Sequence, residues 1–217
     1  MNDVVIRDIE ERDLPDLKLL IVEAFGDGWN LGRFNQGEDS FQALMEVYLS
    51  VFLNSSTFGR VAEKENKIIG AILTCAKGEP KKYRILQKDI APNTLSLLLA
   101  PEDQRADVVE HLSTSFRVIG SLLENKESDY DGSLEFIAVS KQYQGSKIGK
   151  TLWNEASAYF KSKGVKSLYL ITDSACNLGF YDYNGFAKVV SSEAVYNYTT
   201  GQKKFEICLY DYHFCEN

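Results

Sequence analysis

Apolar residues along this chain recur at two spacings, one typical of strands and one typical of amphipathic helices. In the first third of the chain they predict strand, helix, helix, strand and strand, in the segments DVVIRDI, EERDLPDLKLLIVEAFGDG, DSFQALMEVYLSVFLN, TFGRVAEK and KIIGAILTCAK. Only Glu65 and Asn66 separate the last two segments. This pair suits a tight hairpin turn.

The pattern is interrupted at residues 78–132, where an irregular stretch precedes helical pieces broken at Pro101. We interpret these residues as a helical insertion within a single domain, residues 1–217, because a chain of this length fits one core. After them, LEFIAVS alternates too little for a solvated edge and predicts a central strand. The remaining segments predict helix, strand, short helix, strand and strand, in GKTLWNEASAYFKSKG, KSLYLIT, DSACNLGFYDYNG, FAKVVSSEAVY and KKFEICLYDYHF.

Charge and hydrophobicity narrow the function classes. The 217 residues carry a formal net charge of −7, whereas nucleic-acid binders usually present a basic face. No apolar run approaches the roughly 20 residues that span a bilayer, and the N-terminus MNDVVIRDIEERD lacks the features of a signal peptide. We therefore expect a cytoplasmic protein with neither a nucleic-acid nor a membrane partner.

Metal chemistry and hydrolase-type nucleophiles have little support in the sequence. The cysteines are scattered without a C-x-x-C pair, and the two histidines, His111 and His213, lie far from other obvious ligands. A Ser-His-Asp or Cys-His centre would need one of these histidines, and no G-x-S-x-G elbow is present. We expect no metal site.

The stretch VSKQYQGSKIGKTLW joins the predicted central strand to a helix through a glycine-containing loop. Successive backbone N–H groups at a helix N-terminus favour an anion. Gly145, Ser146 and Gly149 allow a ligand to approach the main chain, while Lys147 and Lys150 add positive charge. An ordinary strand-to-helix turn would explain the same glycines equally well. A Walker A loop needs one more residue between its glycines, and a G-x-G-x-x-G dinucleotide loop is absent.

A third type of phosphate loop fits better. The order strand, Q/R-x-x-G-x-G/A loop, helix, strand, asparagine and FY…GF resembles the GCN5-related N-acetyltransferase (GNAT) family, in the segments LEFIAVSKQYQGSKIGKTLW, KSLYLITDSACN and FYDYNGFAKV. The resemblance covers roughly Leu134 to Val190. It implies an α/β (α+β) fold with a mixed, mostly antiparallel central sheet flanked by helices, and with the helical insertion between the third and fourth strands.

The resemblance also implies that the central strand and the loop bind acetyl-CoA (coenzyme A). In the family, the strand main chain binds the pantetheine arm, the loop binds the pyrophosphate, and the asparagine contacts the pantetheine or a bridging water. The corresponding residues here are Ile137, Ala138, Val139, Gln144, Gly145, Ser146, Lys147, Ile148, Gly149, Lys150 and Asn177. Lys147 replaces the first glycine of the motif; it costs little there at negative φ, whereas positive φ would disturb the binding geometry. Asn177 could instead satisfy backbone groups of the short helix.

Two side chains are candidates for proton transfer. Tyr181 aligns with the family tyrosine that protonates the leaving sulfur, although it could simply pack among neighbouring aromatic residues. Glu135 is a carboxylate in an otherwise apolar strand, and it could accept the proton of the amine directly or through water, form a salt bridge, or attract a cation. The Val139 amide is the candidate donor to the thioester carbonyl. Asp173 and Ser174 are interpreted as helix caps.

By the resemblance, the acceptor binds near the first two helices and the last strands. Trp29, Phe34 and Tyr196 are the candidate substrate-binding residues, although scattered surface aromatics would explain them too. The predicted function is acetyl-CoA-dependent N-acetyl transfer, directly to a primary amine of a small molecule or protein. One alternative is a non-catalytic acyl-CoA-binding sensor or scaffold. Another is a phosphate-loop nucleotide enzyme, which is disfavoured because the loop lacks the required spacing. Residues 78–132 could cover the acceptor site, cover a sheet edge or form a homodimer surface.

Overall fold

The computed structural model describes residues 3–25, 39–83 and 96–215, and it contains the predicted elements in the predicted order. The helices are α1 (Leu14–Phe25), α2 (Asp39–Ser55), α4 (Glu102–Leu123), α5 (Ile148–Ser162) and α6 (Leu178–Tyr183). The strands are β1 (Val5–Arg7), β2 (Phe58–Lys64), β3 (Lys67–Ala76), β4 (Gly132–Val139), β5 (Ser167–Asp173), β6 (Ala187–Tyr198) and β7 (Gly201–His213). The α/β fold class is confirmed.

The strands form one seven-stranded sheet in the order β1-β2-β3-β4-β5-β7-β6. All neighbouring strands are antiparallel except β4 and β5, which are parallel. Glu65 and Asn66 join β2 to β3 with φ angles of 52° and 61°, as a type I′ hairpin turn requires. The mixed, mostly antiparallel sheet, the hairpin and the central position of β4 are therefore confirmed.

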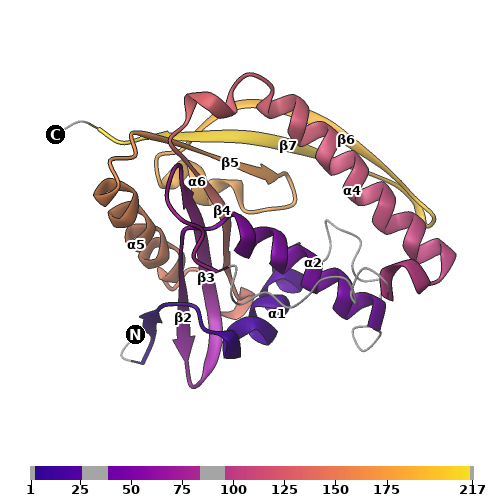
Figure 1. Cartoon of the computed structure of the whole chain (residues 1–217), viewed down its shortest axis with the longest axis horizontal. Helices are drawn as coiled ribbons and strands as arrows, with labels where there is room; N and C mark the ends of the chain where they lie inside the picture. Colours follow the sequence, from indigo (N-terminus) through magenta and orange to yellow (C-terminus); the bar gives the residue numbers. More distant parts are fainter. Residues whose placement is uncertain (1–2, 26–38, 84–95, 216–217) are drawn as a thin grey trace.

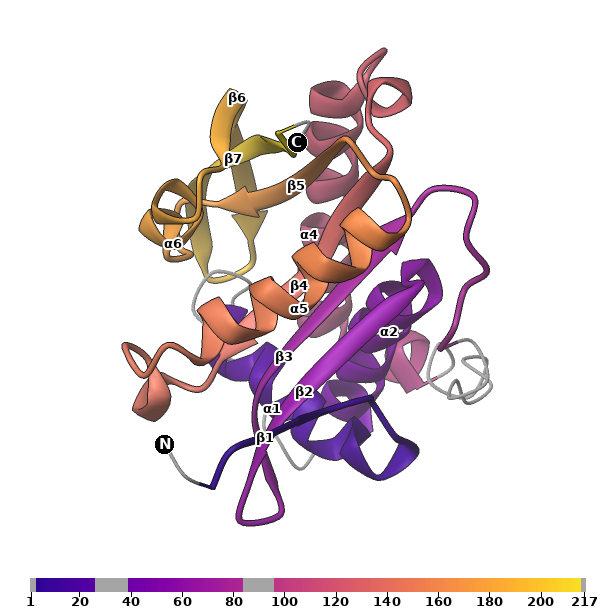
Figure 2. The ribbon, with the colours of Figure 1, turned by 90° about the vertical axis from the view of Figure 1, so that its left-hand side faces the viewer.

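The sheet divides between β4 and β5. These two strands pair only at Gly132 with Leu168 and at Ser133 with Tyr169, whereas β5 stays paired with β7 along its whole length. Figure 2 shows β5, β6 and β7 turning away from the β2–β4 half of the sheet. Beyond Ser133, the edge of β4 that faces β5 therefore has no neighbouring strand within the described residues.

Helices cover both faces of the β1–β4 half of the sheet. Helices α1 and α2 bury Leu17 and Leu44 against one face, and α5 buries Leu152 and Phe160 against the other. Figure 1 shows α5 and the α1–α2 pair on opposite sides of β2 and β3. Each such side chain contributes about 1.5–3 kcal/mol of hydrophobic stabilisation when it leaves water. This packing fixes β4 rigidly at the centre of the molecule.

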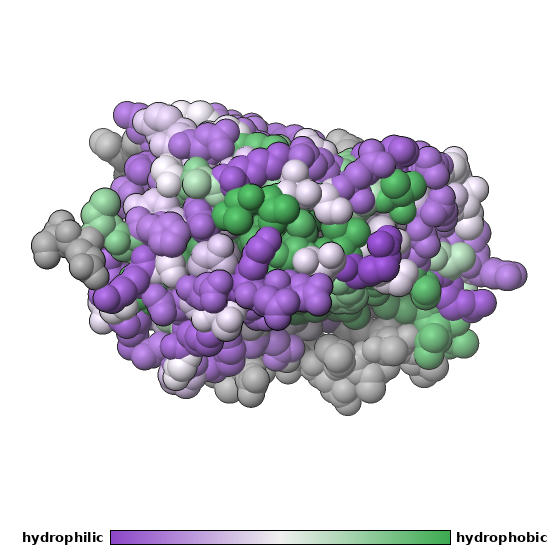
Figure 3. All heavy atoms as spheres, turned by 90° about the horizontal axis from the view of Figure 1, so that it is seen from above, coloured by the Kyte–Doolittle hydropathy of each residue, from purple (hydrophilic) through white to green (hydrophobic). Residues whose placement is uncertain are grey.

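Helix α4 lies along β6 and β7 in the other half of the sheet (Figure 1). Its inner face contributes Val118 and Leu122 to a core that includes Tyr196. Seen from above, the surface is mostly hydrophilic with separate hydrophobic areas (Figure 3), as expected when amphipathic elements bury their apolar faces. Helix α4 begins directly after Pro101, where the sequence pattern is broken. The assignment of residues 78–132 as an insertion within a single domain stays a prediction.

Candidate active site

A bulge in β4 sets the direction of Glu135. The pairing with β3 passes from Leu73–Phe136 to Thr74–Leu134, so Glu135 has no opposite residue. Leu134 packs on the α5 side of the sheet and Phe136 on the α1–α2 side, although residues two apart in a regular strand share a face. Bulges re-aim side chains in this way. The Glu135 carboxylate accepts a hydrogen bond from the hydroxyl of Ser133.

The unpaired edge of β4 presents backbone groups to a ligand. The Ser140 amide donates to the Ile69 carbonyl at 2.9 Å, so the main chain of Ser140 faces β3. Main-chain groups alternate between the two edges of an antiparallel strand. This alternation turns Ala138 toward β3, and it turns Ile137 and Val139 toward β5. An extended ligand could therefore pair with Ile137 and Val139 as an added strand would.

The loop between β4 and α5 leads into a helix N-terminus. Gly145 and Lys147 adopt positive φ angles of 79° and 66°. The first helical hydrogen bond runs from the Thr151 amide to the Lys147 carbonyl at 2.9 Å. The amides of residues 148–150 therefore have no partner within the helix, and the helix dipole favours an anion beside them.

Two cases were considered for Lys147, a negative and a positive φ. The structure has the positive φ, which is the unfavourable case. It costs a non-glycine residue roughly 1–2 kcal/mol. The turn forms nevertheless, and the Ser146 hydroxyl supports it by donating to the Tyr143 carbonyl. The Lys147 side chain is exposed. The cost of the lysine therefore falls on the stability of the loop, while the amides stay at the helix N-terminus.

Gly149 and Lys150 occupy different surroundings in the first turn of α5. A Cβ atom on Gly149 would lie 3.0 Å from Phe180 and 3.6 Å from Val139, so this turn approaches α6 and β4 as closely as a glycine allows. The Lys150 ammonium donates to the Asn184 side-chain oxygen at 2.8 Å. Lys150 is thus tied to the end of α6, and a phosphate would have to compete with Asn184 for it.

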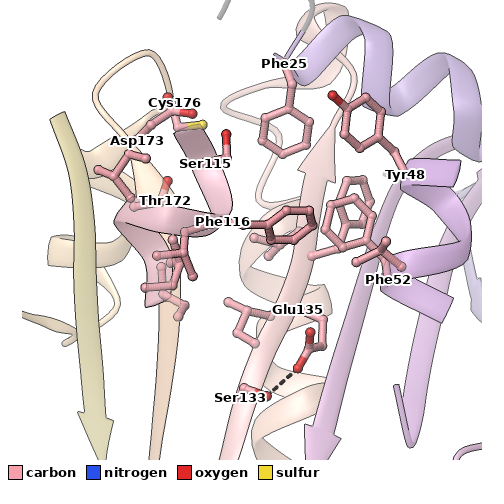
Figure 4. Close-up of a pocket in the computed structure, with 18 of the residues that line it drawn as sticks. Phe25, Tyr48, Phe52, Ser115, Phe116, Ser133, Glu135, Thr172, Asp173 and Cys176 are labelled. Carbon is pink, nitrogen blue, oxygen red and sulfur yellow. Dashed lines mark hydrogen bonds between the residues drawn. The ribbon is translucent and has the colours of Figure 1, made fainter. Parts of the chain in front are cut away.

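A cleft of about 390 Å³ lies between the diverging strands and is bounded by α2 and α4. We call it the β4–β5 cleft. Figure 4 shows Glu135 from β4, Asp173 from β5, Phe116 from α4 and Phe52 from α2 around this space. Its lining is mostly apolar and also includes Phe25, Tyr48, His111, Cys176, Tyr181 and Tyr196. The structure therefore brings the two candidate catalytic residues, Tyr181 and Glu135, to one cleft.

Tyr181 belongs to a cluster of polar groups at the β5 wall of the cleft. Burial raises the pKa of Tyr181 above its usual value, and a hydrogen bond with the Thr172 hydroxyl opposes this shift. Burial also raises the pKa of Cys176 to about 11. The pKa of Asp173 is raised by burial as well, although the Ala175 amide donates to its carboxylate at 2.8 Å. Tyr181 and Cys176 therefore keep their protons at neutral pH, and Tyr181 can donate one.

The predicted acceptor-binding residues are only partly described. Tyr196 lies on the α4 side of the cleft, where its hydroxyl is 3.1 Å from the Ser115 hydroxyl and its ring stacks on His111 with centroids 5.2 Å apart. Burial lowers the pKa of His111 to about 4. Trp29 and Phe34 lie outside the described residues.

Gln144 and Asn177 are exposed at the ends of the predicted cofactor site. Asn177 is the N-cap residue of α6, but its side chain makes no capping hydrogen bond. The side chain of Asn177 therefore does not cap the backbone of α6, which was the alternative to a contact with the cofactor. Its contact with a cofactor stays a prediction.

The sequence interpretation gives Asp173 a different role and does not include Phe116. Asp173 does not cap α6, because the N-cap of that helix is Asn177. Strand β5 continues one residue beyond KSLYLIT, and alternation along the strand places Asp173 on the same face as Ile171. That alternation was the available signal. Phe116 lies on α4, whose apolar spacing indicates a buried face without identifying what the face contacts.

Metal sites and membrane-spanning helices were not expected from the sequence. The described part of the chain contains no group of three or more His, Cys, Asp or Glu side chains that could hold a metal ion. None of the described helices is both long and apolar enough to cross a membrane.

Comparisons with known proteins agree with this architecture. The family described as "Acetyltransferase (GNAT) family" matches residues 19–186, and no curated protein sequence matches the chain. An apo-form mutant of agmatine N-acetyltransferase has a TM-score of 0.59 at 14% identity, over 98% of this chain and 100% of that one. An IAA acetyltransferase from Bacillus cereus has a TM-score of 0.52 at 15% identity, over 97% and 99%. A GNAT-family acetyltransferase from Streptococcus pneumoniae has a TM-score of 0.51 at 15% identity, over 98% and 100%.

At these identities the similar structures establish the fold alone. The family match covers most of the chain, from the middle of α1 to the residue before β6. It includes the divided strands, the loop at the N-terminus of α5 and Tyr181. The chain therefore belongs to the GNAT acetyltransferase family.

Proposed function

We propose that the protein is an acetyl-CoA-dependent N-acetyltransferase that transfers the acetyl group directly to a primary amine. The observation that carries the proposal is the unpaired edge of β4 beside the N-terminus of α5. Ile137 and Val139 would hold the pantetheine arm along this edge, and the amides of residues 148–150 would hold the pyrophosphate. The open space around Gly145 leaves room for a bulky phosphate ligand. When bound, acetyl-CoA supplies an acetyl group activated as a thioester.

The side chains of the β4–β5 cleft can manage the two proton transfers. As the amine nitrogen bonds to the carbonyl carbon, Glu135 accepts the proton that the nitrogen loses, directly or through water. Tyr181 would donate its proton to the leaving sulfur as the carbon–sulfur bond breaks. The Val139 amide is the candidate donor to the carbonyl oxygen, where negative charge develops. Glu135 and Tyr181 then exchange protons with solvent.

Steady-state kinetics with a panel of small amines and lysine-containing peptides test this function. Tyr181→Phe should lower kcat about a hundredfold or more, because general acids typically contribute at least that factor. Its dissociation constant for acetyl-CoA should stay unchanged, because the phenyl ring keeps its packing. Glu135→Gln should lower kcat if the carboxylate is the base, and should leave kcat near the wild-type value if water is.

The kinetic pattern tests the direct route. Direct transfer predicts intersecting lines in initial-rate plots and no acetylated enzyme by mass spectrometry after incubation with acetyl-CoA alone. Parallel lines and an acetylated enzyme would contradict it, because they are typical of a covalent intermediate. Binding of acetyl-CoA without turnover of any acceptor would support the alternative of a non-catalytic acyl-CoA-binding protein.

A further inference from the structure

The β4–β5 cleft has walls of aromatic rings. Phe25 and Phe52 lie against Phe136 with ring centroids 6.1 and 5.2 Å apart, on the side of α1 and α2. Tyr196 contributes a ring from β6. Phe116 reaches the cleft from α4 and is 62% exposed to solvent, and Figure 4 shows it facing the other rings across the space. An apolar ligand in the cleft would cover the Phe116 ring, and burial of that area would favour its binding.

The charged residues described at the cleft have one sign. Among the described residues that line it, Glu135 and Asp173 are acidic, and none is a lysine or an arginine. His111 is neutral at pH 7, because burial lowers its pKa to about 4. Asp173 is half-buried, and the Ala175 amide at 2.8 Å is a neutral donor. A carboxylate in such surroundings favours a positively charged partner.

We propose that the acceptor has a single primary amine, which is an ammonium in water, on a bulky, ring-containing apolar body. Asp173 receives the ammonium, which loses one proton to solvent before the neutral amine attacks, and the aromatic walls receive the body. This inference rests on the proposed transferase function and specifies its acceptor. The volume of about 390 Å³ is in the range of pockets for small molecules. Asp173 and Tyr181 lie at the same wall, so an amine held by Asp173 is close to the group that protonates the leaving sulfur.

The same surroundings disfavour other acceptors. An amino acid would add a third carboxylate beside Glu135 and Asp173, and no described residue of the lining is a lysine or arginine that could receive it. A short alkylamine would leave the aromatic walls exposed to water. A lysine side chain of a protein has the required charge, but its unbranched stem would replace a ring with a narrower group. Recognition of the apolar body and recognition of the ammonium charge can therefore be tested with different acceptors.

Acetylation rates for four acceptors test the proposal: 2-phenylethylamine, phenylalanine, n-propylamine and a lysine-containing peptide. We expect kcat/KM for 2-phenylethylamine to exceed each of the others at least about tenfold, because one missing charge partner or ring contact is worth that factor. Asp173→Asn should raise the KM for 2-phenylethylamine about tenfold to a hundredfold and change kcat much less. Glu193→Gln removes an exposed carboxylate that pairs with Lys204 on the β6–β7 hairpin, and it should keep the wild-type constants.

The acceptor class would be overturned if phenylalanine, n-propylamine or the peptide were acetylated as well as 2-phenylethylamine. It would also be overturned if Asp173→Asn left the KM unchanged. Should Asp173→Asn not fold, Phe116→Ala provides the second test, because it should reduce the preference for 2-phenylethylamine over n-propylamine. Acetyl-CoA binding is measured in parallel by calorimetry. Binding with transfer to the wrong acceptor defeats only this inference, whereas absence of binding defeats the proposed function itself.

Discussion

The buried histidine of α4 should make stability depend on pH. His111 is 5% exposed, its Nδ1 lies 2.8 Å from the Tyr198 hydroxyl, and burial lowers its pKa from 6.5 to about 4. Between these values the unfolded chain binds a proton that the folded chain does not. Stability is therefore lost as pH falls from 6.5 to about 4, and the contribution is constant below that. At about 1.4 kcal/mol per pKa unit, the full loss is about 3 kcal/mol.

Urea unfolding at intervals between pH 8 and pH 4 measures this loss. His111→Gln keeps a polar partner for Tyr198 and removes the titration, so its free energy of unfolding should fall less than that of the wild type over this range. The difference isolates His111, because carboxylates titrate equally in both proteins. Equal falls in wild type and His111→Gln would refute the reasoning.

Three further substitutions test local features by urea unfolding. Gly149→Ala places a Cβ 3.0 Å from Phe180, and this crowding should offset the roughly 1 kcal/mol that alanine gains over glycine in a helix; a rise of 1 kcal/mol in the free energy of unfolding would contradict this close packing. Lys147→Gly should raise the free energy of unfolding by up to about 1 kcal/mol, because the relief of left-handed strain exceeds the cost of the added backbone entropy in the unfolded state; a loss of stability would contradict the φ of 66°. Asp13→Ala should lower the free energy of unfolding by about 3 kcal/mol, because the buried Asp13 accepts hydrogen bonds from both terminal guanidinium nitrogens of Arg7 at 2.7 Å. A change below about 1 kcal/mol would count against that pairing.

The order of elements was predictable because it depends on local pattern. The Glu65–Asn66 pair between two apolar runs identifies the β2–β3 hairpin, and the positive φ angles at both residues agree with it. The weak alternation of LEFIAVS identifies β4 as central, and β4 pairs with β3 on one edge and with β5 on the other. Neither inference requires knowledge of distant residues.

The shape of the site depends on contacts that no local pattern contains. The bulge at Glu135 is a property of the register with β3, since Leu134 and Phe136 would share a face in a regular strand. Strand β5 leaves β4 after two paired positions while it stays paired with β7, and no local pattern indicates where the pairing with β4 ends. Phe116 reaches the cleft because α4 crosses β6 and β7, and its spacing along the helix does not indicate this partner.

The most direct test of the central claim is the shift in melting temperature with acetyl-CoA, CoA, ATP and NAD. At a hundredfold excess over the dissociation constant, binding adds about 2.7 kcal/mol, which corresponds to roughly 5–10 °C for a chain of this size. We expect acetyl-CoA and CoA to give this shift and the other nucleotides to give less. Lys147→Glu should reduce it by placing a carboxylate at the anion site, whereas Lys77→Glu, at the far end of β3, should not. No shift with saturating acetyl-CoA would contradict the account.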